Sequence, residues 1–424
     1  MVPLLRCLLC LCGFLIGTGG LAEATESTAS ADKMTTHCEH TDPNQPNLYL
    51  WNPENLNITR TRLANTPSSS VSKAYERLLR NAEKALISGP FSVVFKTKTP
   101  PSGNKQDYYS TAPYWWPNPA TKDGLPYIRK DGVTNPDRKN SDTDRESLGQ
   151  LSNNVVTLSL AAYLSGEIRY AQKAATLLRV WFLDELTSMN PHLNYAQAIP
   201  GVTDGRGVGI IDTYSLVQVI DAIGLLEHMT ALSAREIAGL KGWFTDYTLW
   251  LITSSNGMDE RKRSNNHGIY YDLQVAVFAA FVGDYTAVKV MLDSIKNRRI
   301  PSQINAKGQL PAELKRTKSF HYTAFTIRGL MDAADLAECI GEDLWMHTTP
   351  KGAGLQAAID FQATYAGKLD AWKFKRTGTI KTEHLFTNLL RAADAYKTDS
   401  YRQKALVYQR THSSSLAWLL YPEY

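Results

Sequence analysis

ESLGQLSNNVVTLSLAAYLSGEIRYAQKAATLLRVWFLD, residues 146–184, shows the helical pattern of this chain most plainly. Apolar residues recur at spacings of three and four on both sides of a short turn at Gly166, which predicts helices over 146–165 and 168–184. A turn this short makes consecutive helices antiparallel. We therefore expect this stretch to form a helical hairpin.

The same periodicity returns along most of the chain, whereas alternating strand-like runs are scarce. A repeat of fixed length, which an open solenoid would show, is absent. We predict an all-α fold with a single domain, an α/α toroid that forms an incomplete barrel of about five to seven helical hairpins. The other expected helices are 71–88, 210–230, 233–254, 267–283, 284–297, 322–340, 353–366, 382–397 and 400–420.

The N-terminus has the layout of a secretion signal. Arg6 precedes an apolar run over 7–16, and small residues follow up to Ala24. The run is shorter than the about 20 residues that span a bilayer, and we expect no later stretch to serve as a membrane anchor. The predicted organisation is a signal peptide at 1–24, a polar extension at 25–69 and a toroid domain at 70–424. We expect a secreted, extracellular protein.

Two cysteines, Cys38 and Cys339, remain outside the predicted signal. In an oxidising compartment they could form a disulfide, or they could be two separate buried thiols. The net charge of +5 is modest and its basic residues are scattered, which argues against a nucleic-acid partner and is compatible with an acidic polysaccharide. The glycines at 205–209 lack the spacing of a dinucleotide loop, and we expect no cofactor, no membrane partner and no obligate protein partner.

Long connections are expected at 96–143, 186–209, 256–266 and 299–321, and in a toroid such loops gather at one end and form a cleft. The first contains aromatic residues that could stack on sugar rings or could pin the loop to the body. The second contains polar groups suited to hydroxyls and carboxylates, although an ion pair between its arginine and Asp212 is an equal alternative. The residues concerned are Tyr109, Trp115, Trp116, Asn194, Tyr195, Gln197 and Arg206.

Asn265, Asn266 and His267 come where a polar loop meets the helix expected at 267–283. One asparagine can cap that helix. A helix N-terminus disfavours imidazolium, so His267 would be neutral and able to accept a proton.

A basic loop leads into the helix expected at 322–340 and contains Lys315, Arg316, His321 and Tyr322. Basic groups beside a tyrosine could bind an anion and stabilise a phenolate. The alternative is a solvated loop with Tyr322 packed on the wall of the ring.

Four of these residues supply what β-elimination from a uronic acid requires. The C5 proton becomes acidic only when the neighbouring carboxylate is neutralised, a task that fits Asn266 and Arg316. A base must then remove that proton and an acid must protonate O4, tasks that fit Tyr322 and His267. In β-linked mannuronate or glucuronate the C5 hydrogen and O4 lie on the same side of the sugar ring, so Tyr322 could act as both base and acid. In guluronate they lie on opposite sides, so His267 would be the base, and in neither case is a metal expected.

The chain resembles the alginate-lyase superfamily of helical toroids, which includes polysaccharide lyase families five and thirty-eight, and it is more similar to family thirty-eight. The resemblance covers about residues 105–345. It implies a toroid lyase acting on alginate or glucuronan, with the four residues above in the roles described. The matching runs are 114–117, 123–129, 189–191, 193–197, 205–213, 265–268 with Tyr271, Asp272 and Gln274, 313–314, 316–317 and 321–322.

Arg316 and Tyr322 are one residue closer together than the family-five pattern, so either Arg316 or Lys315 could meet the carboxylate. Two other functions stay open. A glycoside hydrolase would use a pair of acids, and a sugar-binding protein would use only the aromatic loop. The candidate acids are Asp142, Asp144, Glu146 and Glu313, for which capping of a helix N-terminus is the alternative role.

Overall fold

The computed structural model describes residues 44–65 and 70–422. The predicted signal peptide, most of the predicted extension and Cys38 lie outside these residues. Helices dominate the described chain, which confirms the predicted fold class. The α-helices are α2 (Pro53–Asn65), α3 (Ser70–Leu86), α4 (Arg145–Ser165), α5 (Ile168–Leu178), α6 (Leu216–His228), α7 (Ala234–Thr253), α8 (Ser255–Arg261), α9 (Asn266–Val282), α10 (Tyr285–Ser294), α11 (Ile300–Gln303), α12 (Pro311–Leu314), α13 (Ser319–Cys339), α14 (Leu355–Ala363), α15 (Glu383–Ala395), α16 (Asp399–Leu406) and α17 (Ala417–Leu420).

The helices form an α/α toroid with an inner and an outer layer. Inner helices α4, α6, α9, α13 and α15 contact one another in this order. Hairpins add an outer helix, as in α4 with α5, α9 with α10 and α15 with α16. Fifteen of the seventeen residues of α9 are buried, because this inner helix is covered on all sides. Helices α2, α3 and α17 contact one another beside α15 and α4.

Several predicted boundaries differ from the structure. The helix expected at 168–184 ends as a π-helical turn over Arg179–Leu183, and the one expected at 210–230 begins as a 3-10 segment over Gly207–Thr213. The single helix expected at 400–420 is wrong, because α16 and α17 are separate. The irregular loop expected at 256–266 is also wrong, since α8 occupies most of it. Helices of four to seven residues, such as α8, α11 and α12, are too short to show helical periodicity.

One apolar stretch, Gly207–His228, is long and apolar enough to cross a membrane by length and composition, contrary to our expectation that none would be. In the structure 72% of its apolar window is buried. Its composition is explained by α6, an inner helix that has protein on all sides.

The segment before α2 is attached to the toroid through the buried side chain of Asp221 on α6. Its carboxylate accepts backbone N–H groups of Tyr49, Leu50 and Trp51 at 2.7–2.9 Å. Gly224, one turn later, leaves room for the chain, because a Cβ there would lie 2.0 Å from the Asn47 carbonyl oxygen. Residues before the predicted domain start at 70 therefore pack against the helical body.

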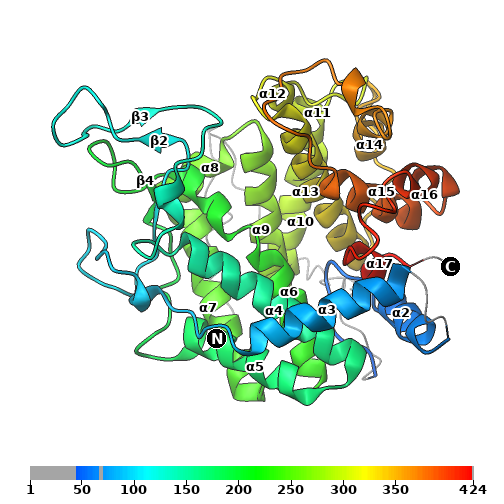
Figure 1. The fold of residues 1–424 in the computed structure, drawn as a ribbon, viewed down its shortest axis with the longest axis horizontal. Coiled ribbons are helices and arrows are strands. Elements are labelled where there is room, and N and C mark those ends of the chain that lie inside the picture. The colour runs from blue at the N-terminus through cyan, green and yellow to red at the C-terminus, as the bar shows by residue number, and fades with distance from the viewer. Residues whose placement is uncertain (1–43, 66–69, 423–424) are drawn as a thin grey trace, which may run out of the picture. The chain divides into compact units, whose positions relative to one another are not determined.

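Four short strands lie in the long loops. β1 (Tyr109–Thr111) pairs in parallel with β4 (Tyr195–Ala198), and β2 (Trp115–Trp116) pairs antiparallel with β3 (Ile128–Arg129). Strands β2, β3 and β4 lie toward the same end of the helices as α8 and α12, at the top of the view in Figure 1. This end carries the polar loops in which the sequence placed its candidate residues.

Candidate functional site

A cleft of about 500 Å³ lies at the end of the toroid where these loops meet. Its lining comes from the β2–β3 hairpin, the loop after β4 and the N-terminal parts of α9 and α13. Guanidinium groups dominate its charge, and the carboxylate among its lining residues is Asp212. The cleft is therefore cationic and suited to a polyanion. Its arginines are Arg129, Arg138, Arg145, Arg206, Arg263 and Arg316.

Eight of the predicted site residues line this cleft. They come from segments as distant in sequence as the aromatic loop and the start of α13, and the toroid brings them together. The eight are Trp115, Gln197, Arg206, Asn265, Asn266, His267, Arg316 and Tyr322.

His267 is held by a carboxylate that the sequence analysis did not single out. Its Nδ1 lies 2.6 Å from Oε1 of Glu260, at the end of α8. Glu260 is 1% exposed and its second oxygen has no hydrogen-bond partner in the described chain. Because a carboxylate only accepts, Nδ1 carries the hydrogen, and in the neutral imidazole Nε2 therefore has the lone pair. The arrangement makes Nε2 the nitrogen that can take a proton.

Asn266 is buried at the start of α9 and contacts Glu313 on α12. Its backbone N–H donates to Oε1 of Glu313 at 2.7 Å, and its Nδ2 lies 2.9 and 3.0 Å from the two carboxylate oxygens. Burial raises the pKa of Glu313, while the hydrogen bonds from Asn266 oppose that rise. Glu313 therefore sets the orientation of the Asn266 amide.

Tyr322 lies between a second tyrosine and a guanidinium. Its hydroxyl is 2.7 Å from that of Tyr114 and accepts a hydrogen bond from Nη2 of Arg316 at 3.0 Å. The Arg316 guanidinium also lies over the Tyr322 ring, 4.0 Å from its centre. Burial, followed by the charge of Tyr114, raises the pKa of Tyr322, and Arg316 acts in the opposite direction. The phenol is therefore protonated at neutral pH, and Tyr114, which the sequence analysis placed in a matching run without a role, is a second site residue.

The structure separates the two candidates for carboxylate binding. Arg316 lines the cleft, and its Nε is buried without a hydrogen-bond partner in the described residues. Its Nη2 lies 3.8 Å from Asp131. Lys315 is exposed and is not among the residues that line the cleft. Arg316 is thus the basic residue placed to meet an anion there.

A network centred on Asp212 supports the wall that carries Arg145 and Arg206. Asp212 is buried and accepts hydrogen bonds from Ser110 and the Gln197 side chain, and it lies 3.4 Å from Nε of Arg145. The Gln197 carbonyl groups in turn accept from Arg206. The predicted direct pair between Arg206 and Asp212 is replaced by a chain through Gln197, whose backbone is held at φ +50°.

Six predicted binding residues do not line the cleft. The Trp116 indole donates to the Val133 carbonyl oxygen, a contact within the same loop. Asn194 accepts a hydrogen bond from Trp250, and the His321 ring stacks on that of Phe325. The contact of all six with a substrate stays a prediction. They are Tyr109, Trp116, Asn194, Tyr195, Lys315 and His321.

The acids considered for a glycoside hydrolase do not form a facing pair in the cleft. Asp144 is buried against Lys96, with Oδ2 3.0 Å from Nζ. Glu313 is occupied by Asn266. Neither these two nor Asp142 and Glu146 line the cleft.

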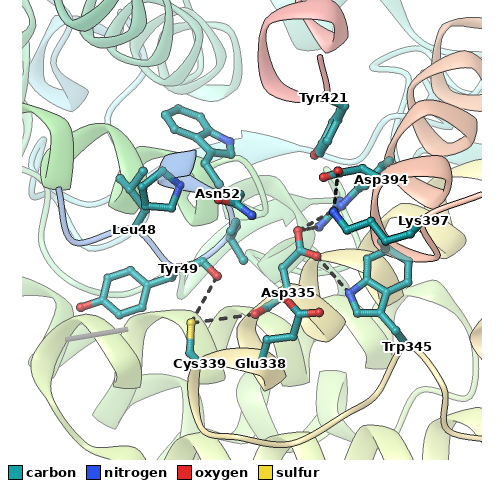
Figure 2. Close-up of a pocket in the computed structure, with 15 residues that line it drawn as sticks. Leu48, Tyr49, Asn52, Asp335, Glu338, Cys339, Trp345, Asp394, Lys397 and Tyr421 are labelled. Carbon is teal, nitrogen blue, oxygen red and sulfur yellow. Dashed lines mark hydrogen bonds and ion pairs between the residues drawn. The ribbon is translucent and has the colours of Figure 1, made fainter. Parts of the chain in front are cut away.

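A second hollow of about 430 Å³ lies at the other end of α13 (Figure 2). Its lining includes Asp335, Arg391 and Trp345, and none of the predicted catalytic or binding residues. Cys339, at its edge, is disulfide-bonded. Cys38, the partner considered above, lies outside the described residues.

Comparison with known proteins gives a consistent family. The sequence model described as "Alginate lyase" matches residues 92–372. The chain is similar to the crystal structure of an alginate lyase from Bacteroides ovatus, with a TM-score of 0.84 and 37% identity, covering 89% of this chain and 100% of that one. It shares the fold of alginate lyase A1-III from Sphingomonas species A1, with a TM-score of 0.58 and 15% identity over 92% and 98% of the two chains. No curated protein matches the chain.

Proposed function

This chain belongs to the alginate lyase family and is a polysaccharide lyase, and from that premise we propose that it cleaves alginate by β-elimination. The observation that carries the proposal is the convergence of His267, Arg316 and Tyr322 on one cationic cleft. An imidazole, a guanidinium and a phenol around one anion site are the groups that this reaction needs. The acids that a glycoside hydrolase would need do not line this cleft, and a non-catalytic binder would not need this set of proton-transfer groups.

Neutralisation of the substrate carboxylate is assigned to Arg316. Its guanidinium lines the cleft, and a guanidinium can form paired hydrogen bonds with a carboxylate. The charge that builds on the carboxylate as C5 loses its proton is thereby stabilised. Asn266 turns its amide nitrogen toward both carboxylate oxygens of Glu313, so its contact with the substrate carboxylate stays a prediction.

Proton transfer is divided between His267 and Tyr322. Nε2 of His267 takes the C5 proton, and the C–H electron pair forms the C4–C5 double bond. The C4–O4 bond breaks with its electron pair on O4, which receives the phenolic proton of Tyr322. The products are a 4,5-unsaturated uronide and a new chain end. A raised pKa suits Tyr322 to this acid role.

This division serves guluronate, in which the C5 hydrogen and O4 lie on opposite sides of the ring. At β-linked mannuronate, or at glucuronate if glucuronan is also a substrate, the same tyrosine would take and return the proton. That route starts from phenolate, which Arg316 stabilises and burial opposes. We therefore expect faster turnover on polyguluronate than on polymannuronate.

The test is to incubate the protein with polyguluronate, polymannuronate and glucuronan and to follow ultraviolet absorbance of the unsaturated ends. Tyr322→Phe removes only the hydroxyl and should lower the rate by about 10³-fold. New reducing ends without absorbance would show a hydrolase. Wild-type rates in Tyr322→Phe would contradict the assigned acid.

We also propose that the protein is secreted, on the strength of the signal-like pattern at residues 1–24. Expression in a secreting host should release a protein whose N-terminus begins after Ala24. Mass spectrometry of the protein from the medium checks this. Retention of Met1 in a cell-associated protein would contradict it.

A further inference from the structure

Arg299 is buried directly beneath the segment that carries His267. It ends a π-helical turn, Ile295–Arg299, and its side chain is 1% exposed. Its Nε and Nη2 lie 2.7 and 2.9 Å from the two carboxylate oxygens of Asp272 on α9. Arg299 and Asp272 thus form a bidentate ion pair that attaches Arg299 to α9, the helix that contains His267.

The other donors of Arg299 grip the chain before that helix. Nη2 donates to the carbonyl oxygen of Arg261 at 2.8 Å, and Nη1 donates to that of Arg263 at 2.7 Å. Arg261 is the last residue of α8, where unpaired carbonyls favour a cation. One guanidinium therefore joins the end of α8, the following loop and α9.

The guanidinium also lies against the residue that follows His267. A Cβ added at Gly268 would be 2.4 Å from Nη1 of Arg299 and 2.2 Å from the Arg263 carbonyl oxygen. The backbone and Arg299 are consequently packed together with no side chain between them. Arg299 therefore contacts the backbone both before and after His267.

We propose that Arg299, paired with Asp272, is a positioning residue of this site that fixes the 260–268 backbone so that Glu260 orients His267. The inference rests on the proposed function for its effect on turnover. Arg299 must bind three groups at once, which are the Asp272 carboxylate and the carbonyl oxygens of Arg261 and Arg263. The planar fork of arginine can do this, whereas the single ammonium of lysine cannot.

The chain offers a matched control in Arg391 on α15. Arg391 is 4% exposed and forms a comparable buried fork, with Nη1 2.6 Å from Asp332 and Nη2 2.5 Å from Asp335. It lines the hollow of Figure 2 and not the cleft. Arg391→Lys therefore reports the general cost of losing a buried fork.

The experiment compares Arg299→Lys and Arg391→Lys in the full chain. Both should lower the thermal midpoint. Only Arg299→Lys should lower kcat on polyguluronate, by about 10- to 100-fold, with KM within about twofold, because a displaced base affects the chemical step more than binding. If Arg299→Lys does not fold, Asp272→Asn supplies the comparison, since it removes the charge that Arg299 pairs with and keeps the shape of the side chain.

A second readout does not depend on catalysis. The Nδ1 proton of His267, hydrogen-bonded to Glu260, should give a downfield proton resonance that His267→Gln removes. This resonance should shift or broaden in Arg299→Lys or Asp272→Asn and stay unchanged in Arg391→Lys. An unchanged resonance, or kcat equal to that of the control, would overturn the proposal. A wild-type protein without lyase activity would overturn the proposed function, and the resonance would still decide whether Arg299 positions His267.

Discussion

Glu260→Gln changes one atom type and should remove the base from the reaction. In the wild type the carboxylate accepts the Nδ1 hydrogen of His267 at 2.6 Å, which leaves the Nε2 lone pair for the substrate. An amide nitrogen at that position donates to Nδ1 instead, so the ring adopts the tautomer with its hydrogen on Nε2. That tautomer cannot accept the C5 proton.

The magnitude follows from the burial of this pair. Glu260 is 1% exposed and the His267 side chain is 20% exposed, so water can replace little of the lost interaction. A comparable change of tautomer in the serine-protease triad lowers kcat by about 10⁴-fold. Because His267 keeps some contact with solvent, we expect a fall of about 10²- to 10³-fold on polyguluronate, or about 3 to 4 kcal/mol of transition-state free energy.

Initial rates of unsaturated-end formation on the two homopolymers measure this effect. The loss should be smaller on polymannuronate, where Tyr322 can act alone. Glu383→Gln is a control for the chemical change alone, because Glu383 is half-exposed and lies 2.7 Å from Nδ1 of His412 outside the cleft. Wild-type rates on polyguluronate in the folded Glu260→Gln protein would refute the assignment of His267 as the base.

Three other changes have expected outcomes. Arg316→Lys keeps a charge but loses the guanidinium fork, so kcat/KM on alginate should fall by about 10- to 100-fold in steady-state assays. Burial lowers the pKa of His384 to about 4 from about 6.5, so the unfolded chain takes up the proton first and stability is lost as pH falls from about 6.5 through 4. Urea unfolding at pH 7 and pH 4 measures the loss, and His384→Gln should reduce it by up to about 3 kcal/mol. An equal loss of unfolding free energy in the wild type and the variant would contradict this. Gly224→Ala should lower the free energy of unfolding by about 2 kcal/mol or more, because its Cβ would meet the Asn47 carbonyl oxygen. Gly242→Ala, at an exposed position on α7, should raise it by about 0.5–1 kcal/mol, and urea unfolding measures both.

Helical periodicity was enough to predict the long helices of this chain. The hairpin of α4 and α5 is visible in residues 146–184, because apolar spacing and a short turn are local properties. The same method failed for α8, whose seven residues span about two turns. It also merged α16 and α17, which are separate short helices.

The candidate site was partly visible in the same way. His267 and Tyr322 stand in the first turns of long helices, where a polar loop gives way to an apolar pattern. Glu260 carries no such signal, because it lies on a helix that periodicity did not detect. The choice between Lys315 and Arg316 was also undecided, because adjacent residues have the same sequence context and differ only in the direction of their side chains.

The sequence by itself determined the helical class, the toroid and the chemical types of the groups available for the reaction, because periodicity and residue identity are written along the chain. Only the tertiary structure decided which of these groups share a cleft, which carboxylate orients His267 and which way the Asn266 amide faces. These relations join atoms of residues up to 208 positions apart, and they depend on how helices pack. Distances between such atoms are a property of that packing, and no local pattern contains them.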